Sequence, residues 1–234
     1  MRDRARQIIA IGGGGFYRDS ENLKLERYVI QQTRVPEPRV VFVPTASGES
    51  DQYIASFYAA FLKLQCRPSV LAFFKRTPDL RSMLLNQDVI YVGGGNTKSM
   101  FAVWRDWDIT EILREAWEAG IVLTGVSAGA ICWFEQGVTD SFAGELKPLG
   151  CLGFLPGSCC PHYDGEADRR PSYHRLLGTG EIAAGVAIED WTGIHYVGTK
   201  MERVIASKQG ARAYSVSAVN GLVQEVPLTA EYLE

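Results

Sequence analysis

Short apolar runs that end in turn residues alternate with longer stretches of helical period along the first two thirds of the chain. The runs include residues 40–44 (VVFVP), 89–92 (VIYV) and 121–126 (IVLTGV). Between them, residues 51–65 repeat apolar side chains at helical spacing behind a Ser or Asp cap. Near-continuous Val, Ile, Leu and Phe runs are typical of strands that are buried on both faces. The pattern therefore predicts a parallel sheet with helices packed on both sides.

The predicted fold class is α/β, a three-layer sandwich with a mostly parallel central sheet, helices on both faces, and additional C-terminal strands or hairpins. The C-terminal part follows from a change of pattern after residue 186, where glycines separate short apolar runs without helical stretches. No linker, repeat or low-complexity segment interrupts the 234 residues. Residues 1–234 are therefore expected to form one domain, with a core that needs no disulfide or metal support.

Charge and cysteine content argue against several classes of protein. The 24 Lys and Arg residues are balanced by 27 Asp and Glu residues, so no basic surface is expected for nucleic acid or an anionic membrane. The five cysteines include no CxxC pair, which favours reduced thiols and a cytoplasmic location.

The apolar run before Gly12 is too short for a signal-peptide core or a membrane span. The 3 histidines are scattered, so neither a metal nor another cofactor is expected.

Two glycine-rich turns follow apolar runs. Residues 12–15 (GGGG) lack the third glycine of a dinucleotide-binding fingerprint, because Tyr17 occupies that position, and no GK[ST] follows for a phosphate loop. The simplest interpretation is a tight strand-to-helix turn. Residues 93–97 (GGGNT) also end a strand and begin a helix. Such a turn presents free backbone N–H groups to an anion or a transient oxyanion.

Residues 125–129 (GVSAG) fit the pattern G-x-S-x-G between a buried apolar run and a small-residue helix predicted over residues 128–134. This strand-turn-helix context holds a serine hydroxyl in an exposed, strained position, and small neighbours let the backbone make the sharp turn. Ser127 is therefore the candidate nucleophile. The alternative interpretation is a buried serine that caps the helix.

A serine nucleophile needs a base, and the chain has 3 histidines. His174 lies in a predicted surface helix and His195 in an apolar, strand-like run. His162, in a predicted loop, is therefore the base by elimination. The third member should be a carboxylate at a strand end that orients the imidazole, and Glu189 and Asp140 are the two candidates.

These motifs resemble those of the peptidase E and cyanophycinase family of serine peptidases, in the same order along the chain. The motifs are GGGNT at 93–97, GVSAGA at 125–130, VTDS at 138–141, PHYD at 161–164 and GVAIED at 185–190. GGGNT together with G-x-SAGA is the specific pair. The similarity extends over nearly the whole chain, and it implies the class I glutamine-amidotransferase-like architecture of that family.

The resemblance implies a role for each matching residue of the catalytic machinery. Ser127 would be the nucleophile, His162 the general base and Glu189 the acid of a Ser-His-Glu triad. Asp140 matches an aspartate that is important in the family, so it would support the site rather than relay to His162.

The resemblance also implies contacts with substrate. The amide groups of Gly95 and Ala128 would form the oxyanion hole. Peptidase E relatives remove an N-terminal aspartate from dipeptides and use an arginine a little after the catalytic histidine; Arg169, or else Arg170, occupies that place. The expected substrate-binding residues are Gly94, Asn96, Arg169 and Arg170.

The expected function is hydrolysis of small peptides through an acyl-enzyme, as a dipeptidase with a preference for N-terminal aspartate. The alternatives are a cyanophycinase-like β-aspartyl peptidase, a carboxylic-ester hydrolase built on the same G-x-S-x-G pattern, and a catalytically inactive amidotransferase-like binding module. True amidotransferases of this architecture have a cysteine where Ser127 stands, and Cys132 is expected in the core, so glutaminase activity is not expected. The expected partners are a small peptide substrate and a second copy of the chain in a homodimer.

Overall fold

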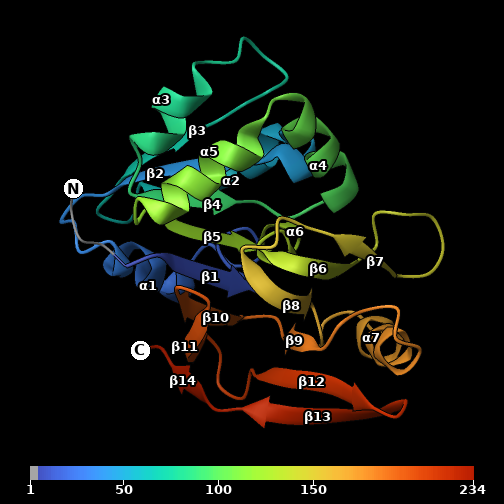
Figure 1. Cartoon of the computed structure of the whole chain (residues 1–234). Helices are drawn as coiled ribbons and strands as arrows, with labels where there is room; N and C mark the ends of the chain where they lie inside the picture. The colour runs from blue at the N-terminus through green and yellow to red at the C-terminus, as the bar shows by residue number, and fades with distance from the viewer. Residues whose placement is uncertain (1–4) are drawn as a thin grey trace.

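The computed structural model describes residues 5–234, so residues 1–4 of the short N-terminal segment discussed above lie outside the described part. Its larger sheet has 8 strands in the order β14-β11-β10-β1-β5-β4-β2-β3 (Figure 1). These strands are β1 (Gln7–Ile11), β2 (Arg39–Val43), β3 (Arg67–Val70), β4 (Val89–Val92), β5 (Val122–Val126), β10 (Thr192–Val197), β11 (Lys200–Ala206) and β14 (Ala230–Tyr232). Strands β1, β5, β4, β2 and β3 are parallel neighbours, whereas β10 is antiparallel to both β1 and β11.

The mostly parallel sheet that the apolar runs predict is confirmed, together with the reason for those runs. Every residue of β4 and β5 is buried. In β1, Ile8 and Ala10 pack into the core on one face of the sheet, and Ile9 and Ile11 pack into the core on the other. Because both faces are covered, neither set of alternating positions can be polar.

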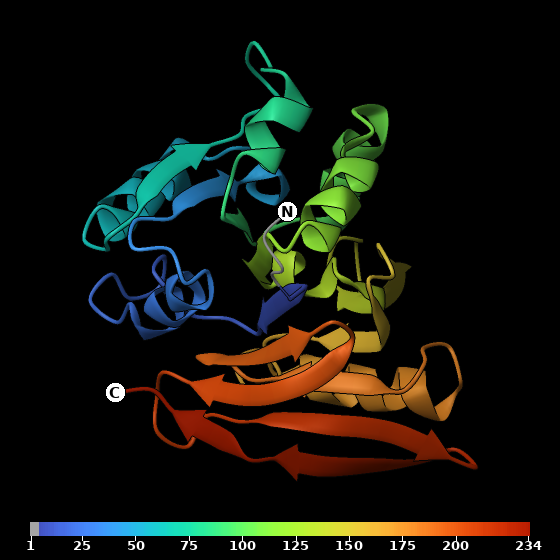
Figure 2. The same cartoon turned by 60° about the vertical axis from the view of Figure 1, so that its left-hand side comes forward.

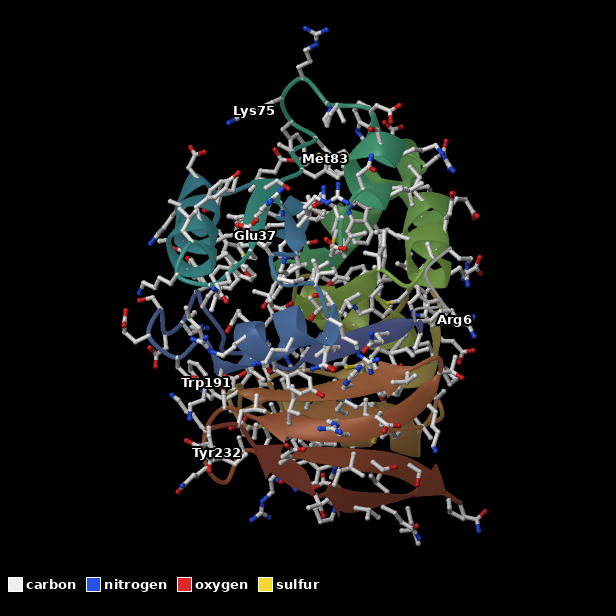
Figure 3. All side chains as sticks on the ribbon, turned by 90° about the vertical axis from the view of Figure 1, so that its left-hand side faces the viewer. Arg6, Glu37, Lys75, Met83, Trp191 and Tyr232 are labelled. Atoms are coloured by element: carbon white, nitrogen blue, oxygen red, sulfur yellow. The ribbon has the colours of Figure 1, made fainter. Side chains whose placement is uncertain are left out.

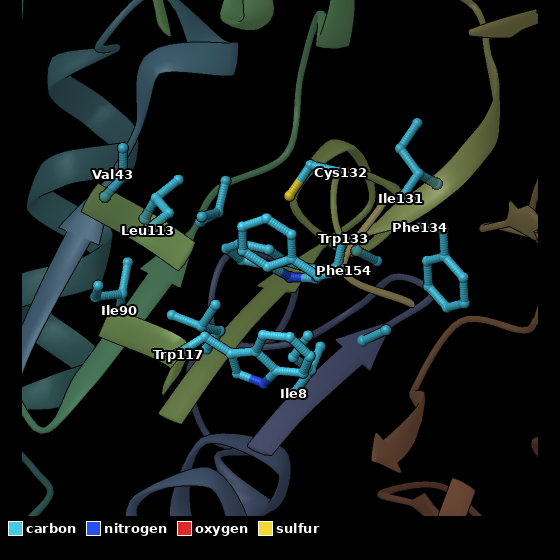
Figure 4. Packing of buried hydrophobic residues seen from close by; sticks show 14 of the residues in the cluster. Ile8, Val43, Ile90, Leu113, Trp117, Ile131, Cys132, Trp133, Phe134 and Phe154 are labelled. Atoms are coloured by element: carbon cyan, nitrogen blue, oxygen red, sulfur yellow. The ribbon is translucent and has the colours of Figure 1, made fainter. Parts of the chain in front are cut away.

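Helices cover both faces of this sheet. The face of Ile9 packs against α1 (Lys24–Gln32) and α2 (Asp51–Phe61), and the Ser50 Oγ caps α2 by accepting a hydrogen bond from the amide of Tyr53. The other face packs against α3 (Leu80–Leu85), α4 (Thr97–Asp106), α5 (Ile109–Glu118) and α6 (Ala128–Ile131). Figure 4 shows Trp117 of α5 near Trp133 and Phe154 in that core. Within the described residues, no helix has both the length and the apolar character needed to cross a bilayer.

A second sheet of 6 strands, in the order β13-β12-β9-β8-β6-β7, packs beside the first. Its strands are β6 (Phe134–Thr139), β7 (Lys147–Gly150), β8 (Leu155–Cys160), β9 (Gly185–Ile188), β12 (Ala213–Val219) and β13 (Leu222–Leu228). The sequence predicted strands appended to a single sheet, but the C-terminal strands are divided between the two sheets. The predicted helix over residues 128–134 also ends at Ile131, because Phe134 already begins β6.

The outer face of the second sheet is covered by α7 (Arg169–Gly178), where the sequence predicted a surface helix. Tyr173, Leu176 and Leu177 of this helix are buried with Val216 of β12. In Figure 2 the β12–β13 hairpin lies at the end of the molecule farthest from α3. The second sheet therefore lies between the core of the first sheet and α7.

Candidate active site

The turn between β5 and α6 has the strained geometry expected of a nucleophile elbow. Ser127 has φ 58° and ψ −112°, a combination that L-residues rarely adopt. The two flanking glycines allow it: a Cβ on Gly125 would lie 2.4 Å from the Gly129 oxygen, and one on Gly129 would lie 2.1 Å from the Val92 oxygen. The Ser127 amide donates a hydrogen bond to the carbonyl of Ile11 over 3.0 Å. This bond fixes the elbow to the end of β1.

His162 is attached to the next carbonyl of the same strand end. It follows β8 with a φ of 52°, and its amide donates to the Gly12 oxygen over 3.3 Å. Ser127 and His162, which are far apart in the chain, are therefore bonded to consecutive carbonyl groups. Within residues 5–234, the Ser127 Oγ makes no hydrogen bond to another residue.

The carboxylate next to His162 is Asp190. The His162 Nδ1 lies 2.7 Å from the Asp190 Oδ1, so the Nδ1–H donates to the carboxylate and the Nε2 is left as an acceptor. The Asp190 amide in turn donates to the Asp164 Oδ1 over 2.8 Å. Burial alone would raise the pKa of Asp190, but the hydrogen bond and charge of His162, with the charges of Arg18 and Arg169, lower it below its usual value. Asp190 is therefore held as an anion.

Glu189, the acid expected from the sequence, makes different contacts. Its Oε2 accepts a hydrogen bond from the Arg212 amide over 2.7 Å, and its Oε1 accepts one from the Tyr214 hydroxyl over 2.9 Å. Adjacent residues at a strand end point in opposite directions, so Glu189 faces β12 while Asp190 faces His162. The carboxylate beside His162 in the structure is therefore Asp190, one residue after the Glu189 expected from the sequence. The GVAIED motif contains both carboxylates, and it gives no sign of which one turns toward the histidine.

Arg169 is buried in a cage of acceptors and does not offer a free cation. Its side chain is 3% exposed. The Nε donates to the Glu166 Oε2 over 2.6 Å, the Nη1 donates to the Val138 carbonyl over 3.0 Å, and the Nη2 lies 3.6 Å from the Asp140 Oδ2. Asp140 therefore contacts Arg169 and lies away from the His162–Asp190 pair.

Arg170, the alternative substrate arginine, is also paired. Its guanidinium hydrogen bonds to both carboxylate oxygens of Glu225 and lies 5.2 Å from the centre of the Tyr163 ring. Both arginines nominated from the sequence thus have carboxylate partners within the protein.

Replacing Arg169 by alanine is expected to lower the free energy of unfolding by about 2 kcal/mol, because three charge-assisted contacts are lost and a buried volume is left unfilled. For a chain of this size that corresponds to a fall in Tm of about 5 °C. The measurement is thermal unfolding followed by circular dichroism. An Arg170→Ala variant, whose side chain is 51% exposed, is the control and should change Tm less. An unchanged Tm with a raised KM in Arg169→Ala would instead favour a direct role in substrate binding.

Two amide groups close to Ser127 in the chain or in the neighbouring glycine turn have no partner in the described residues. In the described part of the chain, neither the Gly95 nor the Ala128 amide has a hydrogen-bond partner, whereas the Gly94 amide donates to the Tyr53 hydroxyl over 3.3 Å. A Cβ on Gly94 would lie 3.2 Å from the Ser127 Cβ, so the turn passes close to the serine. Asn96 caps α4, since its Oδ1 accepts from the Ser99 amide over 2.8 Å.

The first glycine turn belongs to the same site, although the sequence suggested only a structural role for it. A Cβ on Gly13 would lie 1.8 Å from the Asp190 Oδ1 and 2.5 Å from the His162 Nδ1, and one on Gly14 would lie 2.7 Å from the Trp191 ring. Only glycine can pass behind the His162–Asp190 pair at this distance. Figure 3 shows Trp191 on the opposite side of the molecule from Arg6, which precedes β1, so the site lies at the far end of that strand.

The other two histidines and the cysteine that follows α6 have structural contacts. The His195 ring bonds to the Tyr28 hydroxyl over 2.9 Å and to the Gln7 Oε1 over 3.0 Å, and burial lowers its pKa to about 4. His174 contacts Tyr163. Cys132 is fully buried in the core shown in Figure 4. Across residues 5–234, no group of three or more His, Cys, Asp or Glu side chains is arranged to hold a metal ion.

Comparison with known proteins places the chain in a family. The chain is 49% identical over 229 residues to an uncharacterized peptidase, YgaJ, of Bacillus subtilis (strain 168), and the match covers 97% of this chain and 99% of that relative. It is 26% identical to peptidase E of Shewanella denitrificans, with 81% of each chain covered. The crystal structure of a peptidase from an acI-B1 Actinobacterium shares the fold, with a TM-score of 0.74, 19% identity, and coverage of 97% of this chain and 95% of that one. The sequence pattern that defines Peptidase family S51 matches residues 8–204, and the chain therefore belongs to that family.

Proposed function

We propose that the chain is a serine-type peptidase in which Ser127 is the nucleophile, His162 the general base and Asp190 the residue that orients the histidine. Membership of Peptidase family S51 supports a peptidase. The observation that carries the catalytic assignment is the 2.7 Å contact between the His162 Nδ1 and the Asp190 Oδ1, at the strand end to which the Ser127 elbow is bonded. Fixing the tautomer in this way leaves the Nε2 free to accept the serine proton.

The proposed reaction is acyl transfer from the peptide to water. The His162 Nε2 takes the proton of the Ser127 Oγ as that oxygen attacks the scissile carbonyl carbon, and Asp190 stabilises the imidazolium that forms. The imidazolium then protonates the leaving amine, which frees the first product. A water molecule, deprotonated by the same nitrogen, attacks the acyl-enzyme, and the Ser127 oxygen recovers a proton as the second product leaves.

The amides of Gly95 and Ala128 are proposed to hold the oxyanion. Both are free of protein partners in the described residues, as a preorganised donor must be. Gly94 lines this region but offers no free donor, because its amide already donates a hydrogen bond to the Tyr53 hydroxyl. Asn96 contributes indirectly, because its side chain holds the first turn of α4.

The order of the three residues along the chain favours this proposal over an ester hydrolase of the α/β-hydrolase type. Those enzymes place the acid between the serine and the histidine. Here the carboxylate that contacts His162 is Asp190, which comes last. Asp140, which would restore the other order, pairs with Arg169.

The proposed substrates are short peptides with N-terminal aspartate, and the cation proposed to read the acidic group is Arg18. Arg18 follows the first glycine turn, where its amide bonds to the Gly15 oxygen over 3.0 Å. Its charge helps to lower the pKa of Asp190, so the guanidinium lies close enough to act on the charge at the site. No carboxylate within residues 5–234 pairs with Arg18, in contrast to Arg169 and Arg170.

The test is a panel of Asp-Xaa, β-Asp-Xaa and neutral dipeptides with a simple ester, assayed with the wild type and Arg18→Gln. We expect the wild type to cleave Asp-Xaa dipeptides best. Arg18→Gln should raise the KM of these dipeptides roughly 10- to 100-fold, because one charge-assisted contact is lost, and should leave the KM of neutral peptides unchanged. Lys208→Gln is the matched control: its ammonium is already stacked 3.7 Å from the centre of the Trp191 ring.

Each outcome of the panel separates the alternatives. Equal cleavage of Asp-Xaa and neutral peptides in both proteins would remove the aspartate preference and leave the peptidase assignment in place. Faster cleavage of β-Asp-Xaa would favour the cyanophycinase-like alternative, and ester cleavage alone would favour an esterase. Failure of a fluorophosphonate probe to label Ser127, together with no turnover, would favour an inactive binding module.

A further inference from the structure

Glu26 is a fully buried carboxyl group beneath the active site that the proposed reaction does not use. It lies in the first turn of α1 and has 0% exposure. Its Oε1 accepts a hydrogen bond from the Phe16 amide over 2.8 Å. Its Oε2 has no hydrogen-bond partner within residues 5–234. A buried acidic residue with one unsatisfied oxygen costs stability, so a functional reason for it is expected.

The hydrogen bond from Phe16 places this carboxyl directly against the first glycine turn. A Cβ on Gly15 would lie 2.7 Å from the Glu26 Oε1, so the backbone of the turn rests on the carboxyl. Two residues earlier, Gly13 lies against the imidazole of His162 and the carboxylate of Asp190. The turn is thus clamped between Glu26 on one side and the His162–Asp190 pair on the other.

A second path runs from the same turn to the other side of the site. The Phe16 ring lies 5.5 Å from the ring of Tyr53. The Tyr53 hydroxyl accepts a hydrogen bond from the Gly94 amide over 3.3 Å, and Gly94 lies against Ser127. The position of Phe16 therefore affects both the turn behind the base and the turn beside the nucleophile.

We propose that Glu26 is a positioning residue of the active site, which holds the turn of residues 13–16 in place through the Phe16 amide and so aligns His162 with Ser127. The proposal rests on the catalytic assignment above. Glu26 touches neither substrate nor the reacting atoms, and its effect reaches them through the backbone of the glycine turn.

The surroundings of Glu26 suit the neutral form of the carboxyl. Burial raises its pKa to about 7, with a smaller opposite effect of the Phe16 hydrogen bond. The titratable groups that face it are the hydroxyls of Tyr53 from α2 and Tyr91 from β4, and the Tyr91 hydroxyl is buried without a partner in the described residues. No cation contributes to the pKa of Glu26. Ionisation above neutral pH would therefore place an unpaired charge beneath the turn and disturb it.

The experiment compares Glu26→Gln and Glu26→Leu with the wild type, by kcat and KM against pH and by hydrogen exchange of the Phe16 amide. Glutamine keeps the acceptor and cannot ionise, so kcat should stay near the wild-type value at pH 6 and should not show the wild-type fall above pH 7 to 8. Leucine removes the acceptor, so kcat should fall at least 10-fold with little change in KM, and exchange of the Phe16 amide should become faster. Asp88→Asn is the matched control, because Asp88 is also a buried carboxylate that accepts a backbone hydrogen bond, from Arg39.

The proposal would be overturned if kcat changed with pH above pH 7 in the same way in the wild type and in Glu26→Gln. It would also be overturned if Glu26→Leu kept the wild-type kcat. If Glu26→Leu does not fold, the glutamine pH profile still decides it, together with the protection factor of the Phe16 amide in the wild type at pH 6 and pH 8.5, which is corrected for the intrinsic pH dependence of exchange. The exchange measurement needs no turnover. A failure of the catalytic assignment, seen as activity that survives loss of Ser127, is therefore distinguishable from a failure of the role of Glu26.

Discussion

Replacement of Ser127 by alanine is expected to lower kcat roughly 10⁴-fold or more for every peptide that the wild type cleaves, while the fold stays intact. The reason is that the proposed acyl-enzyme cannot form without the Oγ, and only binding and the two oxyanion donors remain to assist attack by water. Alanine keeps the Cβ and the backbone bond from the Ser127 amide to Ile11, so the elbow keeps its geometry. The measurement is kcat with dipeptide substrates, alongside circular dichroism and fluorophosphonate labelling.

A Ser127→Gly variant distinguishes the effect of losing the hydroxyl from the effect of backbone strain at this position. The φ of 58° at Ser127 is unfavourable for any side chain, so Ser127→Gly should be as inactive as the alanine variant and more stable than it by about 1 kcal/mol. A higher Tm for glycine than for alanine would show that the elbow is strained in solution. Turnover near the wild-type level in Ser127→Ala would contradict the serine mechanism.

Replacement of Asp190 by asparagine is expected to lower kcat by roughly 10² to 10⁴-fold with a smaller change in KM. An amide in place of the carboxylate can present its NH₂ group to the imidazole, which favours the wrong tautomer and removes the charge that stabilises the imidazolium. The short contact between the Asp190 Oδ1 and the His162 Nδ1 is lost as a charge-assisted hydrogen bond. The measurement is kcat and KM with the best dipeptide, with near-ultraviolet circular dichroism to verify the fold.

Glu189→Gln and Asp140→Asn are the matched controls for this experiment. Each removes one negative charge from a carboxylate that contacts other groups, the Tyr214 hydroxyl and Arg169 respectively. Both should keep kcat within a few-fold of the wild type. Loss of kcat in Glu189→Gln with retention in Asp190→Asn would reverse the assignment and restore the Ser-His-Glu triad implied by the resemblance.

The parts of the fold that follow from local patterns could be predicted from the sequence. The strands of the parallel sheet are apolar throughout because they are buried on both faces, and helix α2 begins behind Ser50 as its capping pattern indicates. The second sheet could not be predicted in the same way. Strand β8 has the sequence LPGSCC, and its proline and glycine resemble a loop because their strand propensity is low. Only pairing with β6 and β9 makes that segment a strand.

The same distinction between local patterns and long-range contacts applies to the candidate site. The elbow at Ser127 could be predicted because it is a local feature, encoded by the small residues on either side of it. Which carboxylate lies next to His162 could not be predicted, because Glu189 and Asp190 are adjacent and chemically alike. The bridge between Gly13 and Asp190 and the pairing of β9 with β12 decide which one turns toward His162. The same holds for Arg169, whose burial among Glu166, Val138 and Asp140 is invisible in a local pattern.

By itself the sequence determined the α/β class, the family, and the serine and histidine on which the proposal rests. The first three depend on residue types at short spacing, and the histidine depends on the small number of histidines in the chain. The tertiary structure decided that three glycine turns meet at the carboxyl edge of the parallel sheet, that Asp190 faces the histidine, and that Glu26 lies buried beneath them. These features depend on contacts between segments far apart in the chain. Their register is set by packing of the two sheets, where a shift of one residue reverses the direction of a side chain.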